Sequence, residues 1–570
     1  MNMFNRLSGT LVLVLLNSFI FGQQKTGIEW INPSKVYYKL KVADNGIYRI
    51  TYEDLVSAGW SHGPVSAGDL RLINFGTEHA IHTSNSAFGP GAWFEFYGEK
   101  NTIGLDSLLY SDWKKDLLNT EYSLVSDTNA YFLTLSPETV NLRYTQINPD
   151  YSSTTLTPFA YYLHTDKVVY SSTFFKNVDG DVRNSYFEPS EGFASGTLQV
   201  SSTTLQTSSF VESGPQPVLS FRLGQNNQQA RVEITWNGQL KETVVTSAKS
   251  TNQFTYTLNK QEISASNTLG LKNVNSANDR HIIAYASLTY PRSFTFDNKP
   301  SYLFSMGSSS SKRLLQISDF NTEGTEVYLY DFKNRLRYAT GRSGNKVLAI
   351  VNPVASETGY ALTNTITGYK TIPSISVFKP RSFNDKGSNY IIISNKNLYN
   401  FGPDYVQEYA DYRSSPEGGS YKTELIEIQD IYDHFGYGID RHFQSVKNMA
   451  SYLKTNWKSA RFVMILGKGV EYPSMRTQSD VLNNQNKLFF IPTFGYVGSD
   501  NMLFSERNFP DPFYAIGRLA ARTPDDIRNY LDKVRLYEKA LEADQTIDAK
   551  YWTKRVLHLG GGKNDFEQTA

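Results

Sequence analysis

The pattern of hydrophobic and polar positions changes near residue 389 of this chain. Before this point, short runs alternate between apolar and polar residues, which is typical of strands with one solvated face. From residue 389 to 562, short continuous apolar runs alternate with segments whose apolar residues recur every three or four positions. Continuous runs suit strands covered on both faces, and the recurring pattern suits the helices that cover them. We therefore expect a β-rich region followed by an α/β region with a parallel sheet.

The α/β region contains several segments with clear strand or helix patterns. Strands are predicted at 390–394, 423–428, 461–466, 489–493, 514–519 and 555–559, of which 514–519 is expected to be buried. A helix is predicted at 405–412, and the glycines in 430–438 favour a turn. Asp440 is expected to cap a helix whose apolar stripe consists of Phe443, Val446, Met449, Ala450, Leu453 and Trp457.

The segment that begins at Thr523 combines three helix-start signals. Thr523 can act as the cap, Pro524 occupies the first helical position, and Asp526 is the acidic residue three positions after the cap. The apolar face of the predicted helix consists of Ile527, Tyr530, Leu531, Val534, Tyr537 and Leu541.

The β-rich region begins with a predicted hairpin at 30–51, whose turn is Asp44-Asn45-Gly46. Thr51 and Asp54 then have the spacing of a capping box, and the short helix should end at 58–59. Between 151 and 380, many short alternating segments separated by Gly, Asn, Ser and Pro predict sandwiches. Asn237-Gly238 is the clearest hairpin turn, and no repeat of fixed period is present.

Length, charge and cysteine content limit the classes of protein to which this chain can belong. The chain has 570 residues, enough for several domains, and its net charge of +1 gives no electrostatic case for binding nucleic acid. A short basic region followed by an apolar core at 7–21 predicts a secretory signal with cleavage near 22–24. The alternative is a membrane anchor, but the apolar stretch is shorter than the roughly 20 residues that a span needs. The chain has no cysteine, so packing or bound ions must stabilise it.

The order of these motifs resembles the gingipain-like cysteine peptidases and, within them, the sortase of the type IX secretion system. In the last third, the matching segments are 430–438 and the helix after it, 463–467, Gly498-Ser499-Asp500, 515–519, the helix at Thr523, and Tyr537-Glu538. Segments 36–59, 94–98 and 130–134 resemble the N-terminal part of that sortase. The resemblance implies a caspase-like α/β fold with a Cys nucleophile and a His in a Gly-His-Gly segment.

This chain departs from the family at the catalytic dyad, because it has no cysteine and no Gly-His-Gly. No catalytic residue can be carried over, and no cofactor-binding residue is assigned. Two explanations remain: the chain is part of a longer protein, or the protein is a pseudo-enzyme. We expect the former, because a parallel strand at 555–559 would need a neighbour to bury both of its faces.

Candidate site residues lie where predicted strands end. Ligands of open α/β sheets bind beyond the carboxyl ends of the strands, so Gly467-Lys468-Gly469, Ser499-Asp500 and 560–565 are expected to line a cleft. The alternative is that these glycines have no role in ligand binding and only end the strands. For any single residue, we favour this alternative. Gly467-Lys468-Gly469 lacks the remaining residues of a phosphate loop.

Histidine and carboxylate residues offer a second set of candidates. His434 and His442 could serve as base or metal ligand, with Asp430, Asp433 and Asp440 close by in sequence, but packing or surface roles are favoured. His558 is expected to be packed in the last strand. The oxygen-rich segment 177–181 could accept calcium, although an Asx turn is the simpler interpretation. Metal binding therefore stays open, and no cofactor is expected to be required.

The sequence as a whole predicts a multidomain protein with sandwich-like β-rich domains followed by an incomplete caspase-like α/β domain. The expected division is a signal peptide at 1–22, a β-rich domain at 23–150, a sandwich-like region at 151–385 that could hold two subdomains, and the gingipain-like segment at 386–570. By resemblance, the protein is an exported sortase, at the cell surface, outer membrane or periplasm, that acts on cargo proteins with C-terminal signals and contacts outer-membrane secretion components. The alternative is a non-catalytic secreted scaffold or adhesion protein with a degenerate peptidase-like domain.

Overall fold

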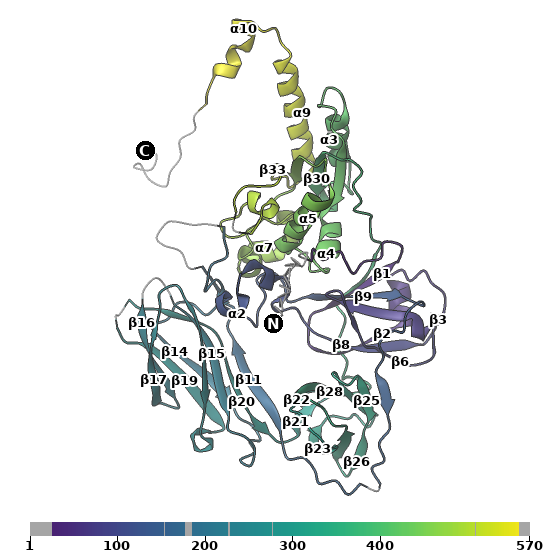
Figure 1. Ribbon diagram of the computed structural model, residues 1–570, viewed down its shortest axis with the longest axis vertical. Coiled ribbons are helices and arrows are strands. Elements are labelled where there is room, and N and C mark those ends of the chain that lie inside the picture. Colours follow the sequence, from purple (N-terminus) through teal and green to yellow (C-terminus); the bar gives the residue numbers. More distant parts are fainter. Residues whose placement is uncertain are drawn as a thin grey trace, which may run out of the picture.

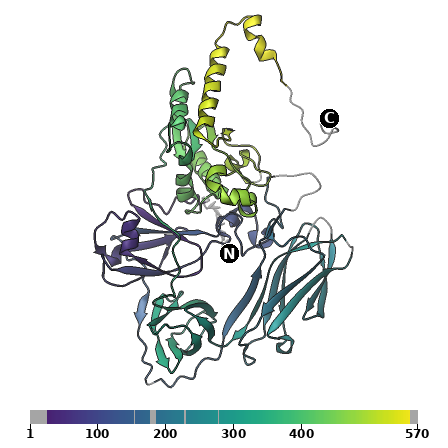
Figure 2. The same ribbon diagram turned by 180° about the vertical axis from the view of Figure 1, so that it is seen from behind.

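The computed structural model describes residues 25–152, 154–176, 185–225, 229–275, 278–507 and 509–557. The predicted signal peptide, the oxygen-rich segment 177–181, His558 and the segment 560–565 lie outside the described residues. The described part forms several β-rich units below an α/β unit, from which the last helices project (Figures 1 and 2).

Two small sheets form the N-terminal unit. Their strand orders are β29 (Ile375–Phe378), β1 (Tyr37–Val42), β9 (Asn129–Leu135), β4 (Leu70–Asn74), β5 (Thr77–His79), and β2 (Gly46–Thr51), β8 (Trp93–Gly98), β6 (His82–Thr83). The predicted hairpin is therefore wrong in its pairing: β1 and β2 are both strands, but each pairs in a different sheet. Helix α1 (Tyr52–Ser57) has the predicted capping box at Thr51 and Asp54.

Two sandwiches share one long sheet. Its order is β10 (Thr145–Ile147), β25 (Leu336–Ala339), β24 (Val327–Asp331), β28 (Thr358–Asn364), β22 (Ser301–Met306), β11 (Tyr162–Val169), β20 (His281–Arg292), β15 (Val218–Gln225), β18 (Thr251–Thr257). One half packs on β14 (Val200–Gln206), β19 (Ser266–Asn273), β16 (Ala230–Trp236), β17 (Gln239–Thr246). The other half packs on β21 (Thr295–Lys299), β23 (Arg313–Phe320), β27 (Lys346–Val351), β26 (Gly341–Ser343).

The sandwich prediction is confirmed, including the hairpin turn between β16 and β17. Asn237 and Gly238 both have positive φ angles, as a tight two-residue turn with the twist of the flanking strands requires. A separate short hairpin, β12 (Thr173–Phe175) with β13 (Gly192–Ala194), leaves the first sandwich and meets the α/β unit.

The α/β unit is built on a parallel four-stranded sheet. Its order is β31 (Thr423–Glu427), β30 (Tyr390–Ser394), β32 (Phe462–Leu466), β33 (Ala515–Leu519). The longer helices are α3 (Tyr405–Ser414), α4 (Ile428–Phe435), α5 (Phe443–Asn456) and α9 (Pro524–Leu541). The predicted stripe of α5 is buried from Phe443 to Trp457. The parallel sheet with covering helices is thus confirmed.

Two predictions in this unit are wrong, and a third is confirmed only in part. Segment 430–438 is helix α4 as far as Phe435, because Ile431, Tyr432 and Phe435 recur at helical spacing. The predicted turn is confined to residues 436–438, where Gly438 has a positive φ angle. Asp440 does not cap α5, since His442 occupies that position. Residues 489–493 form no strand and instead lie in a loop that follows three short helices, α6 (Ser474–Thr477), α7 (Ser479–Asn483) and α8 (Gln485–Leu488).

The C-terminal part differs from expectation in its burial. Strand β33 lies at the sheet edge and is half-buried to exposed, not buried. Helix α9 has the predicted Thr523 capping box, but of its apolar face only Ile527 and Leu531 are fully buried. After the short helix α10 (Ile547–Lys550), residues 555–557 are not strand, and Val556 and Leu557 are 90% and 83% exposed. No helix within the described ranges is both long and apolar enough to cross a membrane.

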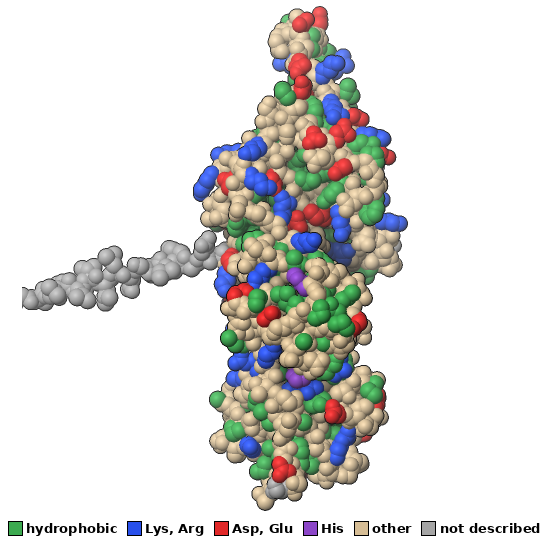
Figure 3. Space-filling model, turned by 90° about the vertical axis from the view of Figure 1, so that its right-hand side faces the viewer, with side chains coloured by type: hydrophobic (Ala, Val, Ile, Leu, Met, Phe, Trp, Pro, Cys, Tyr) green, Lys and Arg blue, Asp and Glu red, His purple; other side chains and the backbone are tan. Residues whose placement is uncertain are grey.

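The core of the α/β unit extends into the β-rich region. One cluster joins the buried residues of β30, β32 and α5 to Leu109, Leu117, Leu124 and Phe193, from segments that precede or belong to the first sandwich. Charged side chains of both signs are interspersed on the face seen in Figure 3, in keeping with the near-zero net charge. The α/β unit is therefore packed onto its neighbours through an apolar core.

Candidate functional site

The carboxyl edge of the parallel sheet is the candidate site. From β30 the chain passes to β31 on one side and then returns to β32 on the other, so the strand order reverses beside β30. At such a switch point the loops diverge and leave a crevice for ligands. Ser394, Glu427, Leu466 and Leu519 end the four strands at this edge.

Arg518 organises the predicted rim. Its Nε and Nη2 donate to both carboxylate oxygens of Asp500, each at 2.7 Å. Nη1 donates to the carbonyl of Gly467 at 2.8 Å, and further bonds reach the carbonyls of Ile491 and Pro492. This bidentate geometry is one that a planar guanidinium makes and an ammonium does not. The structure thus brings two predicted rim segments, 467–469 and 499–500, together on one side chain.

The other predicted rim residues mainly make backbone hydrogen bonds and close packing contacts within the protein. Lys468 donates its backbone N–H to Ala521, and a Cβ at Gly469 would lie 2.8 Å from both the Ile491 carbonyl and the Thr493 side chain. Ser499 pairs with Phe494 through backbone hydrogen bonds. The glycines therefore permit close packing of loops at the strand ends. Among the described residues of this rim, no nucleophilic side chain is hydrogen-bonded to an adjacent base.

Two buried carboxyl groups near the rim were missed from the sequence. Burial raises the pKa of Glu427 to about 7, against the effect of the hydrogen bond that Tyr399 donates to it. Burial also raises the pKa of Glu191 to about 7, although Lys176 and a hydrogen bond from Tyr472 oppose the shift. Glu427 follows a recognisable strand, but nothing local to Glu191 indicates that it meets the loop after β32.

The two candidate histidines are packed and lie on separate networks. His434 is buried between Phe378 and Phe383, donates from Nδ1 to the Asp430 carbonyl at 2.7 Å, and has its pKa lowered to about 4 by burial. His442 accepts the Gln444 amide at Nδ1, so its Nε2–H donates to Asp106 at 2.8 Å. Within the described ranges, the two rings therefore bind a backbone carbonyl and a buried carboxylate, respectively.

The nearby carboxylates bind lysine and arginine side chains. Asp433 accepts from Lys39 at 2.6 Å, Asp440 pairs with Lys41 at 2.8 Å, and Asp430 lies 3.5 Å from Arg381. Within the described ranges, no group of three or more His, Cys, Asp or Glu side chains is arranged to hold a metal ion. These aspartates therefore join the α/β unit to the preceding strands.

Comparisons with known proteins agree with this architecture. Residues 383–570 match the model of peptidase family C25. The structure of dimeric latent PorU from Porphyromonas gingivalis matches with a TM-score of 0.55 and 13% identity, over 92% of this chain and 51% of that one. The chain thus spans about half the length of PorU. Comparison with curated proteins gives no match.

Carbohydrate-binding modules also match part of the chain. A CBM36 domain of a multidomain xylanase from the hindgut metagenome of Trinervitermes trinervoides matches with 19% identity and a TM-score of 0.15, over 22% of this chain and 95% of that one. A family 35 carbohydrate-binding module from Clostridium thermocellum matches with 12% identity and a TM-score of 0.13, over 21% of this chain and 96% of that one. At these scores the matches carry no functional argument. Residues 383–570 therefore match peptidase family C25, and the chain shares the fold of PorU over 92% of its length.

Proposed function

We propose that the chain is part of an exported, PorU-like cysteine endopeptidase that acts as a type IX sortase and removes C-terminal signals from cargo proteins. The observation that carries the proposal is the extent of the fold similarity. It covers 92% of the chain, and so includes the β-rich units as well as the segment that matches the peptidase family. A peptidase segment attached to unrelated domains would not give such coverage.

The proposed chemistry is nucleophilic acyl transfer. A thiolate would attack the scissile carbonyl to form a thioester, while the peptide C–N bond breaks and the C-terminal signal leaves as a protonated amine. Water or another amine would then attack the thioester and release the thiolate. None of the 570 residues is a cysteine, so the thiolate must come from polypeptide outside them. Within this chain, Arg518 and Asp500 hold the loops at the sheet edge, and the β-rich units would position cargo or bind outer-membrane secretion components.

No cofactor is needed for this reaction, and a structural calcium ion at 177–181 stays an untested prediction. The proposed place of action is the cell surface, outer membrane or periplasm, where protein cargo with C-terminal signals would be met after export.

The test is to delete the gene and to analyse the C-termini of exported cargo by mass spectrometry. We expect cargo to retain its C-terminal signal in the deletion strain and to lose it when the native protein is restored. A restored protein in which the nucleophilic cysteine is replaced by alanine should leave the signal in place. Unchanged cargo processing in the deletion strain would contradict the proposal and favour the scaffold alternative.

A further inference from the structure

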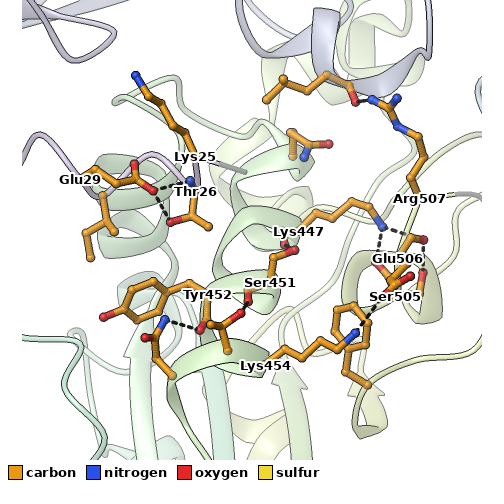
Figure 4. Close-up of a pocket in the computed structure, with 16 residues that line it drawn as sticks. Lys25, Thr26, Glu29, Lys447, Ser451, Tyr452, Lys454, Ser505, Glu506 and Arg507 are labelled. Carbon is orange, nitrogen blue, oxygen red and sulfur yellow. Dashed lines mark hydrogen bonds and ion pairs between the residues drawn. The ribbon is translucent and has the colours of Figure 1, made fainter. Parts of the chain in front are cut away.

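A cavity lies beside helix α5. Its volume is about 870 Å³, and its walls come from α5, the segment 505–513, the N-terminal segment 25–29 and Leu108 (Figure 4). This volume is within the range of sites that bind ligands of several hundred daltons, and it far exceeds the space that a single phosphate ion needs.

Cationic side chains outnumber carboxylates in this cavity. Its lining contains Lys25, Lys447, Lys454 and Arg507, but only Glu29 and Glu506. Both carboxylates already have partners. Glu29 accepts hydrogen bonds from the backbone of Thr26 and Gly27. Glu506 pairs with Lys454 at 2.7 Å. Lys25, Lys447 and Arg507 therefore have no carboxylate partner among the described residues. The Arg507 guanidinium donates to the Leu108 carbonyl, and the Lys25 side chain extends away from Lys447 and Arg507 (Figure 4).

Lys447 is the most deeply placed of the three. Its side chain points from α5 toward the segment at Ser505 (Figure 4), and the residue is only 8% exposed. Nζ donates to the carbonyls of Met502 and Ser505 at 2.8 and 2.6 Å, with a longer contact of 3.4 Å to Glu506. Burial, together with the positive charge of Arg507, lowers the pKa of Lys447 to about 8, although the carboxylate of Glu506 opposes the shift.

A desolvated ammonium beside a second cation is costly unless an anion joins them. Carbonyl dipoles satisfy the hydrogen bonds of Lys447, but they do not neutralise its charge. Lys25 and Arg507 are both exposed at the same cavity. The lining thus carries more cationic than carboxylate side chains, and its charge suits an anionic ligand.

We propose that this cavity binds an acidic peptide segment, whose side-chain carboxylates pair with Lys25, Lys447 and Arg507. A peptide suits the cavity because apolar walls from Ile28 and Phe513 accompany the cations. If the proposed function holds, the peptide belongs to the cargo, and the cavity is a recognition site separate from the sheet edge.

The cavity is connected to the candidate rim by one segment. Lys447 holds the carbonyls of Met502 and Ser505, and Asp500, two residues before Met502, is held by Arg518. A peptide that withdraws Lys447 from these carbonyls would therefore act on the loop that ends at the rim. This gives cargo binding a direct route to the sheet edge.

The test uses the full native protein and a fluorescein-labelled oligoglutamate peptide amidated at its C-terminus. Fluorescence polarisation is expected to show saturable binding that weakens with salt, while the oligoglutamine analogue should not bind. The double variant Lys25→Gln/Arg507→Gln should weaken binding by about tenfold or more. The matched double variant Lys533→Gln/Lys539→Gln, on the exposed surface of α9, makes the same charge change and should bind normally.

A second measurement keeps the test independent of cargo cleavage. Acetic anhydride labelling, read by mass spectrometry, should show that bound oligoglutamate protects Lys25 and Lys447 but not Lys533. Equal binding by the two double variants would overturn the proposal. Displacement of the peptide by an equal concentration of inorganic phosphate would reduce the cavity to a simple anion site, and binding only by peptides with a free α-carboxylate would overturn the assignment to acidic side chains.

Discussion

Glu191 is a single buried carboxyl group that joins the β-rich region to the loop after β32. It follows Ser190 at the start of the β13 segment and is fully buried. The Tyr472 hydroxyl donates to it, Lys176 lies 3.6 Å from it, and the Glu188 amide also donates to it. The Tyr110 hydroxyl donates to the backbone carbonyl of Glu191. The negative charge of Glu188 adds to the rise in the pKa of the Glu191 carboxyl.

We predict that stability depends on pH through this group. Its folded pKa of about 7 is above the ordinary value of 4.5. Its contribution is therefore fully present below pH 4.5 and is lost as the pH rises through 7, by at most about 3 kcal/mol. Urea unfolding between pH 5 and 8 should show this slope, and Glu191→Gln should flatten it. An unchanged slope in the variant would contradict the assignment, whatever the variant's absolute stability.

At the scale of elements, ion pairs hold β1 against helix α4 and the connection that follows it, and the Lys39–Asp433 pair is buried. Lys39 and Lys41 alternate with apolar residues on β1 and meet Asp433 and Asp440. Burial alone would raise the pKa of Asp440, but the two ammonium groups lower it below its ordinary value. Gln429 bridges the two carboxylates. Gln429 therefore links the two ion pairs into one network.

We expect Asp433→Asn to lower the free energy of unfolding by about 3 kcal/mol, because it leaves the Lys39 ammonium buried without its closest counter-ion. Chemical denaturation provides the measurement, and hydrogen exchange should increase in α4 and β1 together. Asp544→Asn, at an exposed position between α9 and α10, is the matched control and should have little effect. Equal stability of both variants would show that the pair contributes nothing.

At the scale of the whole molecule, aromatic rings join the first sandwich to the α/β unit. Phe187 stacks on Phe443 and on Tyr472, with ring centroids 5.6 Å apart in each case, and Phe174 meets Tyr472 edge to face at 5.2 Å. These rings continue one hydrophobic core across the boundary between the units. We infer that the two units unfold together.

Phe187→Ala should uncouple the units, because it removes the ring that packs on both Phe443 and Tyr472. We expect a loss of about 3 kcal/mol and a calorimetric transition that splits into two. Phe401→Ala is the control, since that ring is 80% exposed and its loss should leave one transition. A single unshifted transition for Phe187→Ala would show that the interface does not couple the units.

Local patterns predicted the elements better than their pairing. The Thr523 helix and the Asn237-Gly238 turn were predictable because each signal is complete within a few residues. Helix α4 could also have been found, since Ile428, Ile431 and Phe435 recur at helical spacing, but the glycines at its end favoured a turn. The hairpin failed because the partner of β2 is β8, a choice that depends on distant packing.

In the candidate site too, the sequence predicted the positions of segments but not the contacts between them. The sequence placed 467–469 and 499–500 beyond strand ends, but it could not show that Arg518 joins them. Asp440 looked like a helix cap because its partners, Lys39 and Lys41, lie about 400 residues earlier in the chain. Pairing over such separations leaves no local pattern.

By itself, the sequence determined the succession of β-rich and α/β regions, the parallel sheet and the capped helices. Each of these depends on residue periodicity and on backbone preferences that act over a few positions. Only the tertiary structure decided which strands pair, which carboxylates are buried with raised pKa values, and where cations collect around a cavity. Those properties arise from burial and from charges on distant segments, because solvent exclusion and Coulomb interactions depend on proximity in space and not on order along the chain.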